Sequence, residues 1–217
     1  MLWSPTRPVR GRCKPTGFIL PCQPALSDRP PSGPDWQHEV KWAGYRLIAR
    51  NDGSRVRLWT RTGTDYTACL DRIRWAIAAL PVRSAVLDGE AVAFGDDDCA
   101  NFGALRSLEG QAGAVMIAYD LLELDGEDIR REPLQERRAR LAKILSCGGG
   151  KADQKMQGGL VLSEAISGKG EAVFRQACLM GLEGIVSKRL GSRYVSGRTR
   201  AWLKTKNPNF ERQRITF

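Results

Sequence analysis

The sequence predicts an α+β fold with twisted antiparallel sheets. Short runs rich in apolar and β-branched residues are followed by turn residues more often than by crossover helices, as antiparallel pairing requires. The length of 217 residues suits one large domain better than two complete ones. The hydrophobic fraction of 42% and the charged fraction of 27% are typical of soluble globular proteins, and no apolar run is long enough to span a membrane.

The first 36 residues are rich in proline and arginine and include the run DRPPSGPD, so we expect an extended N-terminal segment over residues 1–36. The pattern changes at His38. Two short apolar runs, EVKWAGYRLIAR and RVRLWT, flank a turn signal at residues 51–54 and predict a β-hairpin. Lys41 is expected at a strand end or in the turn that follows it.

In the middle of the chain, the spacing of apolar residues and the positions of glycine and proline predict the secondary structure. Apolar residues at intervals of three and four predict a helix over residues 66–80 that ends before Pro81. Residues 84–94 are interpreted as strand, turn and strand around the Asp-Gly dipeptide at 88–89. The run VMIAYDLLEL predicts a strand that stops at the Asp-Gly turn at 125–126, and Pro133 is expected to open a helix.

Residues 147–159, CGGGKADQKMQGG, are expected to form a loop. The last third predicts a strand near LVLSEAI, a helix near EAVFRQACLM, a turn at Gly181, and strands at GIVSKR and AWLKTKN. The six cysteines form no CxxC pair and there is one histidine, so reduced structural thiols are expected and no zinc site. The N-terminus lacks the continuous apolar core of a secretory signal, which favours a cytoplasmic protein.

The net charge of +10 is concentrated near the C-terminus, where residues 188–217 carry nine Lys and Arg against one Glu. Such clustering suits a polyphosphate or nucleic-acid surface, because lysine and arginine neutralise phosphates and release their counterions. A solvated basic tail is the alternative that charge alone leaves open.

Six segments follow one another along the chain: EVKWAGYR, RTG, LDGEAV, AYDLL, EGIVSKR and WLKTK. Taken singly, each has an ordinary explanation as a surface lysine, a turn or a core aromatic. Their order and spacing resemble the motif series of the ATP-dependent DNA ligases, most closely the bacterial ligase domains of non-homologous end joining. The resemblance covers about residues 18–208.

This resemblance implies an ATP-grasp-like nucleotidyltransferase fold in which ATP lies between two antiparallel sheets with flanking helices. It places the ligase adenylation domain at residues 37–208, followed by a basic tail at 209–217. Lys41 matches the lysine that attacks the α-phosphate of ATP and carries AMP as a phosphoramidate. The implied substrate is nicked or broken double-stranded DNA, sealed during repair or recombination, with no membrane partner and a location at the bacterial nucleoid.

The resemblance also implies the other site residues, with ATP and Mg²⁺ or Mn²⁺ as cofactors. The residues matched to ATP or AMP binding are Glu39, Arg46, Arg61, Glu90, Tyr119, Lys204 and Lys206. Glu90 and Glu183 match the acidic positions beside the metal. The residues expected to contact DNA are Arg61, Lys188, Arg189 and Arg198.

The chain departs from the family pattern at two places. Ala43 stands where the lysine motif, written KxDGxR, has aspartate. Only eleven residues follow Lys206, too few for an OB-fold, so we expect no OB-fold and a role for end-joining proteins or for a separate OB-fold or basic module. Two alternatives stay open: a catalytically weak or inactive nucleic-acid-binding ligase remnant, and an RNA ligase or capping-type nucleotidyltransferase.

Overall fold

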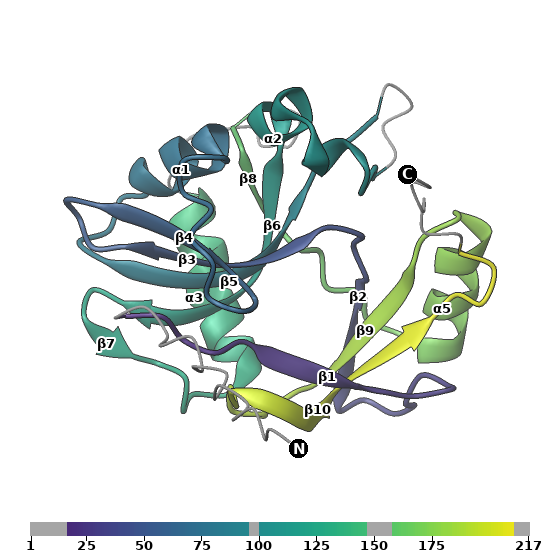
Figure 1. Ribbon diagram of the computed structural model, residues 1–217. Helices are drawn as coiled ribbons and strands as arrows, with labels where there is room; N and C mark the ends of the chain where they lie inside the picture. The colour runs from purple at the N-terminus through teal and green to yellow at the C-terminus, as the bar shows by residue number, and fades with distance from the viewer. Residues whose placement is uncertain (1–16, 96–99, 147–157, 211–217) are drawn as a thin grey trace, which may run out of the picture.

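Two β-sheets face each other across the molecule in the computed structural model (Figure 1). The structure describes residues 17–95, 100–146 and 158–210. Parts of three expected segments therefore lie outside the described residues: positions 1–16 of the N-terminal segment, 147–157 of the loop and 211–217 of the basic tail.

The larger sheet has six strands, of which five follow the order β4-β3-β5-β6-β7. They are β3 (Tyr45–Asn51), β4 (Val56–Thr60), β5 (Ala85–Val92), β6 (Val115–Leu124) and β7 (Glu127–Asp128). The sixth strand, β8 (Leu160–Leu162), pairs with β6 in parallel, whereas all the other pairings in this sheet are antiparallel. The predicted hairpin at residues 51–54 is confirmed, because β3 and β4 pair across it.

The smaller sheet has four strands in the order β1-β10-β9-β2. They are β1 (Cys22–Leu26), β2 (Trp36–Val40), β9 (Gly184–Arg189) and β10 (Gly197–Lys206). Here β1 pairs with β10 in parallel and the other two pairings are antiparallel. Strand β1 lies inside the segment expected to be an extended lead-in, and it forms an edge of this sheet.

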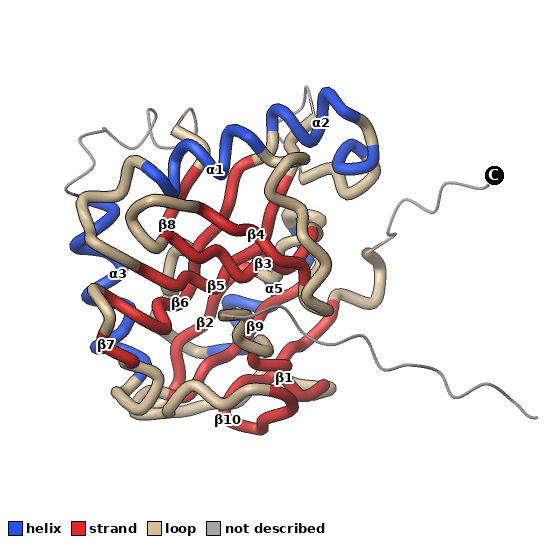
Figure 2. The backbone as a smooth tube through the Cα atoms, turned by 60° about the vertical axis from the view of Figure 1, so that its left-hand side comes forward, coloured by secondary structure: helices blue, strands red, loops and turns tan. Residues whose placement is uncertain are grey.

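Four α-helices and one short 3₁₀ helix flank the sheets within the described ranges. They are α1 (Asp71–Ala78), α2 (Leu108–Gly113), α3 (Leu134–Ser146), α5 (Gly170–Leu179) and the 3₁₀ helix Ala104–Arg106. Figure 2 shows α1 and α3 on the outer side of the six-stranded sheet. Helix α5 packs on β9 and β2 of the other sheet. No helix in the part of the chain that the structure describes is long and apolar enough to traverse a membrane.

Successive side chains along the strands of the larger sheet point to opposite faces, so the sheet separates two hydrophobic clusters. Leu47 and Ala49 of β3 belong to the outer core, where helix residues such as Ile73 and Leu141 cover the sheet. Ile48, between them in sequence, belongs to the inner cluster, which joins the two sheets. The sheets are therefore held together by side chains that face the space between them.

The predicted turn at Asp88–Gly89 is wrong, because β5 runs through both residues without interruption. β5 is paired on both edges, with β3 and with β6, and the irregularity at this point is a register shift against β6. A side chain at position 89 would place its Cβ 2.6 Å from the Ile117 carbonyl oxygen, so glycine is needed there for close strand approach. Long-range pairing on both edges thus overrides the local turn preference.

Candidate active site between the two sheets

A cleft of about 940 Å³ opens between the two sheets. Its walls come from β1, β2, β9 and β10 on one side and from β3, β4, β5 and β6 on the other. The residues of the predicted site that line it are Glu39, Lys41, Arg46, Arg61, Glu90, Tyr119, Lys188, Arg198 and Lys204. Tertiary folding therefore brings nine of the predicted positions, which lie in or directly after seven different strands, to one cavity.

Lys41 is the first residue after β2. Its backbone N–H donates to the Gly184 carbonyl at 2.9 Å, which continues the pairing of β2 with β9 by one residue. Its ammonium lies 2.7 Å from the Glu183 carboxylate, and its side chain is 17% exposed. The strand end thus anchors the backbone, while the amine stays accessible from the cleft.

The loop after Lys41 lies tightly against β5. A Cβ at Gly44 would lie 2.1 Å from the Ala91 carbonyl oxygen and 2.8 Å from Cγ of Glu90, so position 44 accepts only glycine without a shift of the backbone. Ala43, where the family has aspartate, is 4% exposed. The loop therefore places Lys41 and Glu90 at the same end of the cleft.

Glu90 lies directly opposite Arg46 in the pairing of β5 with β3. Burial raises the pKa of the Glu90 carboxyl to about 7, and the negative charges of Glu183 and Asp88 add to the shift against the opposing charges of Arg46 and Lys41. A carboxyl with such a pKa is half-protonated near neutral pH. It is therefore sensitive to any further positive charge brought into the cleft.

Arg46 forms its ion pair with Asp88, two residues before Glu90 in β5. Its guanidinium binds Asp88 through two contacts, Nε to Oδ1 at 2.6 Å and Nη2 to Oδ2 at 2.5 Å. This bidentate geometry restricts the orientation of the guanidinium. The same group lies over the Tyr119 ring, with Cζ 4.8 Å from the ring centroid.

Two carboxylates are available for a divalent metal at the Lys41 end of the cleft. No group of three or more His, Cys, Asp or Glu side chains with metal-binding geometry occurs among residues 17–95, 100–146 and 158–210. Mg²⁺ in nucleotide sites is commonly held by one or two carboxylates together with phosphates and water. Because Glu183 raises the pKa of Glu90, the two carboxylates repel each other, and a cation between them would relieve that repulsion. Glu90 and Glu183 thus fit such an ion.

An aromatic and cationic cluster forms the inner wall. Tyr119 is 9% exposed, and its ring meets Trp202 edge to face at 6.4 Å between centroids. The Lys188 ammonium lies 4.3 Å from the centroid of each of these two rings. Tyr119 therefore presents an aromatic surface inside the cleft that already attracts positive groups.

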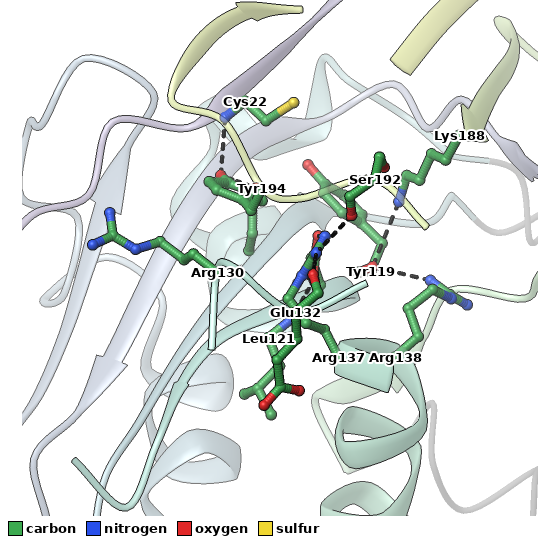
Figure 3. Close-up of polar contacts among 12 residues, drawn as sticks. Cys22, Tyr119, Leu121, Arg130, Glu132, Arg137, Arg138, Lys188, Ser192 and Tyr194 are labelled. Carbon is green, nitrogen blue, oxygen red and sulfur yellow. Dashed lines mark hydrogen bonds and ion pairs between the residues drawn. The ribbon is translucent and has the colours of Figure 1, made fainter. Parts of the chain in front are cut away.

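The Glu39 carboxylate is held by four side chains, one from its own strand and three from distant parts of the chain. It accepts hydrogen bonds from Arg138 Nη1 at 3.0 Å, Ser163 Oγ at 2.8 Å and Gln37 Nε2 at 3.0 Å, and it pairs with Lys188 at 2.8 Å. Figure 3 shows Lys188 and Arg138, which come from different elements, both reaching the Tyr119 carbonyl. Burial lowers the pKa of the Lys188 ammonium against the attraction of Glu39.

The outer part of the cleft is cationic. Burial lowers the pKa of the Lys204 ammonium, and the charges of Lys206, Lys41, Arg61 and Arg198 lower it further. Lys206 and Arg189 are exposed at strand ends and do not line the cleft. Lys188 was expected on the DNA surface, but it is 2% exposed and lies at the inner wall.

Several residues of the site were not predicted. Four of them hold predicted residues or their partners through hydrogen bonds, and one lines the cleft. The four are Arg138, Ser163, Asp88 and Tyr194, and the fifth is Trp202. The sequence predicts Asp88 as part of a turn, and it assigns no role to Trp202, the first residue of the segment WLKTK. Arg138 and its neighbour Arg137 lie in α3, and nothing in the local sequence indicates that they are buried. Two adjacent charged residues on a helix ordinarily lie on its solvent-exposed face.

The arrangement suits a nucleotide. The inner wall supplies an aromatic surface beside a carboxylate, and the outer part supplies cations for phosphates. At one end of the cleft, Lys41 lies near Glu90 of the lining and is paired with Glu183 behind it. An amine next to both phosphate-binding cations and a proton-accepting carboxylate is the geometry needed for nucleophilic attack on phosphorus.

Comparison with known proteins agrees with this arrangement. The family model described as ATP dependent DNA ligase domain matches residues 29–206. The multifunctional non-homologous end joining protein LigD of Pseudomonas aeruginosa is 36% identical over 208 residues, covering 92% of this chain and 24% of that protein. A probable DNA ligase of Streptomyces griseus is 36% identical over 183 residues, covering 77% of this chain and 35% of that protein.

Among solved structures, the ligase domain of LigD from Mycobacterium tuberculosis superposes with a TM-score of 0.72 at 29% identity, covering 87% of this chain and 60% of that one. A mycobacterial DNA ligase D complexed with ATP and MES gives a TM-score of 0.70 with the same identity and coverage. The chain spans about a quarter to a third of the length of these curated relatives. On the family match, the sequence identity and the shared fold, this chain belongs to the ATP-dependent DNA ligase family and contains its adenylation domain.

Proposed function

We propose that this domain forms a lysyl-AMP intermediate on Lys41 and transfers the AMP to the 5′-phosphate of nicked or broken double-stranded DNA. The observation that carries the proposal is the position of the Lys41 amine in the cleft, 2.7 Å from Glu183 and among the cations of the outer wall. Family membership implies ATP and a divalent metal as cofactors. Mg²⁺ or Mn²⁺ is the proposed ion.

The first step requires the Lys41 amine in its unprotonated form. The proton passes from Nζ to the Glu183 carboxylate in contact with it. The nitrogen lone pair then forms a bond to the α-phosphorus, and the bond from that phosphorus to the β-phosphate oxygen breaks. Pyrophosphate leaves with the electron pair, and AMP stays bound to Lys41.

The remaining residues bind and orient the nucleotide in this proposal. Tyr119 supplies the surface on which adenine stacks, and Glu39 contacts the base from the same end of the cleft. Arg46 and Glu90 face the ribose and the α-phosphate. Lys204 and Arg61 hold phosphate oxygens, with Lys206 nearby at the end of β10.

Glu90 and Glu183 are the residues that would hold the divalent ion. When bound, the ion neutralises the charge that develops on the phosphate oxygens. A cation there also favours the ionised form of Glu90, whose pKa burial raises to about 7.

The DNA is proposed to lie along the outer, cationic part of the cleft. Arg61 and Arg198 line that part, and Arg189 is exposed nearby at the end of β9. Lys188 is assigned to the base end of the cleft because its ammonium is buried on Glu39. By analogy with the LigD relatives, the DNA ends are those joined during end joining, with end-joining proteins or a separate OB-fold module as partners.

Incubation with ATP labelled at the α-phosphate and Mg²⁺ tests this function. Wild type is expected to acquire label that is stable to denaturation, Lys41→Ala none, and Lys143→Ala, which alters an exposed lysine of α3, the wild-type amount. GTP labelled at the same position is run in parallel and should give no adduct. An adduct with GTP alone would point to a capping-type enzyme. No adduct with either nucleotide, together with salt-sensitive DNA binding, would point to a non-catalytic remnant.

A further inference from the structure

Tyr194 lies in the segment between β9 and β10. It is not among the residues assigned above to nucleotide or DNA binding. Its side chain is buried, with 6% exposure. The hydroxyl donates to Asp88 Oδ2 at 2.5 Å and accepts from the backbone N–H of Cys22 at 2.9 Å. One phenol thus connects β1 of the smaller sheet with β5 of the larger sheet.

Asp88 is the link between this hydroxyl and the cleft. It is fully buried, and its carboxylate accepts the two contacts from Arg46 in addition to the Tyr194 hydrogen bond. Arg46 in turn lines the cleft beside the Tyr119 ring. The orientation of a cleft arginine therefore depends on a carboxylate that does not itself line the cleft.

Tyr194 is itself held firmly. Its backbone N–H donates to the Arg130 carbonyl at 2.8 Å, and its ring meets Trp202 edge to face at 5.9 Å. Two residues earlier, the Ser192 carbonyl accepts from Arg137 Nη1 at 3.0 Å, as Figure 3 shows. Burial raises the pKa of the Tyr194 hydroxyl well above its ordinary value, so the hydroxyl remains a donor at neutral pH.

We infer that Tyr194 is a positioning residue of the nucleotide site, which acts through Asp88 to hold Arg46 in the orientation that contacts the nucleotide. The inference rests on the proposed function for the identity of the ligand. The chain of contacts from Tyr194 to Asp88 to Arg46 is independent of that function. Because the phenol also binds β1, the same contact ties the smaller sheet to the strand that carries Glu90.

Tyr194→Phe removes the hydroxyl and keeps the ring. We expect AMP, measured by calorimetry, to bind the variant about tenfold more weakly than wild type, as removal of one hydrogen bond to a charged group predicts. The KM for ATP in lysyl-AMP formation should rise by a similar factor, with a smaller change in kcat. Ser192→Ala is the matched control, because its buried hydroxyl has no hydrogen-bond partner among the described residues, and it should bind AMP as wild type does.

A double-mutant cycle separates positioning from a direct or purely structural role. In the Arg46→Ala background, Tyr194→Phe should weaken AMP binding no further, since its effect passes through Arg46. If the two losses multiply, or if Tyr194→Phe alone binds AMP as wild type does, the inference is overturned.

A third measurement needs neither nucleotide nor catalysis. The Nε–H of Arg46, bonded to Asp88 in the structure, should give a slowly exchanging NMR signal in wild type and a rapidly exchanging one in Tyr194→Phe. Asp88→Asn should give the same rapid exchange, which keeps the test valid if Tyr194→Phe folds poorly. Unchanged exchange in both variants overturns the inference. If wild type forms no lysyl-AMP while both variants show rapid exchange, the proposed function fails and the positioning role stands.

Discussion

Lys41 and Glu183 form an ion pair of 2.7 Å at the point where β2 ends and β9 is about to begin. The pair follows from strand register, because β2 and β9 run antiparallel and Val40 lies opposite Ile185. A lysine at the end of one strand is thereby brought to a carboxylate just before the other. This pairing places a carboxylate beside Lys41, although the lysine motif itself has Ala43 where the family has aspartate.

Glu183→Gln should slow lysyl-AMP formation about a hundredfold or more, because an amide can neither accept the proton that Lys41 must lose nor hold the divalent ion as a carboxylate does. The measurement is the initial rate of adduct formation with α-labelled ATP at saturating Mg²⁺. Glu171→Gln, on the exposed face of α5, is the control and should react at the wild-type rate. A Glu183→Gln rate within threefold of wild type would contradict the proton-accepting role.

Ala43→Asp should not increase the rate of adduct formation and should destabilise the protein by about 1–3 kcal/mol. Position 43 is 4% exposed, so the new carboxylate would lose its hydration, while Glu183 already pairs with Lys41. Urea unfolding and the adduct assay are the two measurements. A tenfold increase in rate would show that the aspartate of the family motif has a function that Glu183 does not replace.

Gly44→Ala should both destabilise the domain by about 1–3 kcal/mol and reduce adduct formation, because the added Cβ collides with the Ala91 carbonyl and displaces the loop that carries Lys41. The matched control is Gly113→Ala at the end of α2, where a Cβ meets nothing within 4 Å. That variant should be neutral or slightly more stable. Equal behaviour of the two variants in urea unfolding would refute the steric argument.

Glu90 should make stability depend on pH. Its pKa is about 7 in the folded protein and near 4.5 when unperturbed, so the folded state binds the extra proton between these values. The resulting contribution to the free energy of unfolding is fully present below about pH 4.5 and is lost as the pH rises through about 7. We expect a loss of roughly 3 kcal/mol, measured by urea unfolding in the absence of metal.

Glu90→Gln is the reference for this measurement, because it cannot titrate. The difference in unfolding free energy between wild type and Glu90→Gln should change steadily across the pH interval and level off on both sides. A difference that is independent of pH from 4 to 8 would show that the folded-state pKa of Glu90 is not raised.

The buried pair Arg137–Asp120 should be essential to stability. Both side chains are fully buried, and the guanidinium binds the carboxylate at 2.8 and 2.7 Å. Arg137→Ala leaves the Asp120 carboxyl buried without its cationic partner, at a cost of about 3–5 kcal/mol in urea unfolding. Arg57→Ala, which breaks the more exposed pair with Asp65, should cost no more than about 1 kcal/mol. Similar costs for both variants would be inconsistent with the burial argument.

Local chemistry was sufficient for most elements of secondary structure. The turn at 125–126 was predicted from its Asp-Gly dipeptide, and both residues adopt the positive φ that such turns need. The same dipeptide at 88–89 lies inside β5, because that strand is paired on both edges. The same dipeptide thus forms a turn at one position and continues a strand at the other, and the pairing with neighbouring strands decides between the two.

The sequence by itself determined most of the strands and helices, though not β1, α2 or the unbroken course of β5, together with the position of Lys41 at a strand end and membership of the ligase family. These depend on local periodicity, turn residues and motif spacing. Only the tertiary structure decided which charges meet: Glu183 with Lys41, Lys188 with Glu39, and Asp88 with both Arg46 and Tyr194. These partners are far apart in the chain, and strand register together with the facing of the two sheets, rather than any local preference, sets their distances.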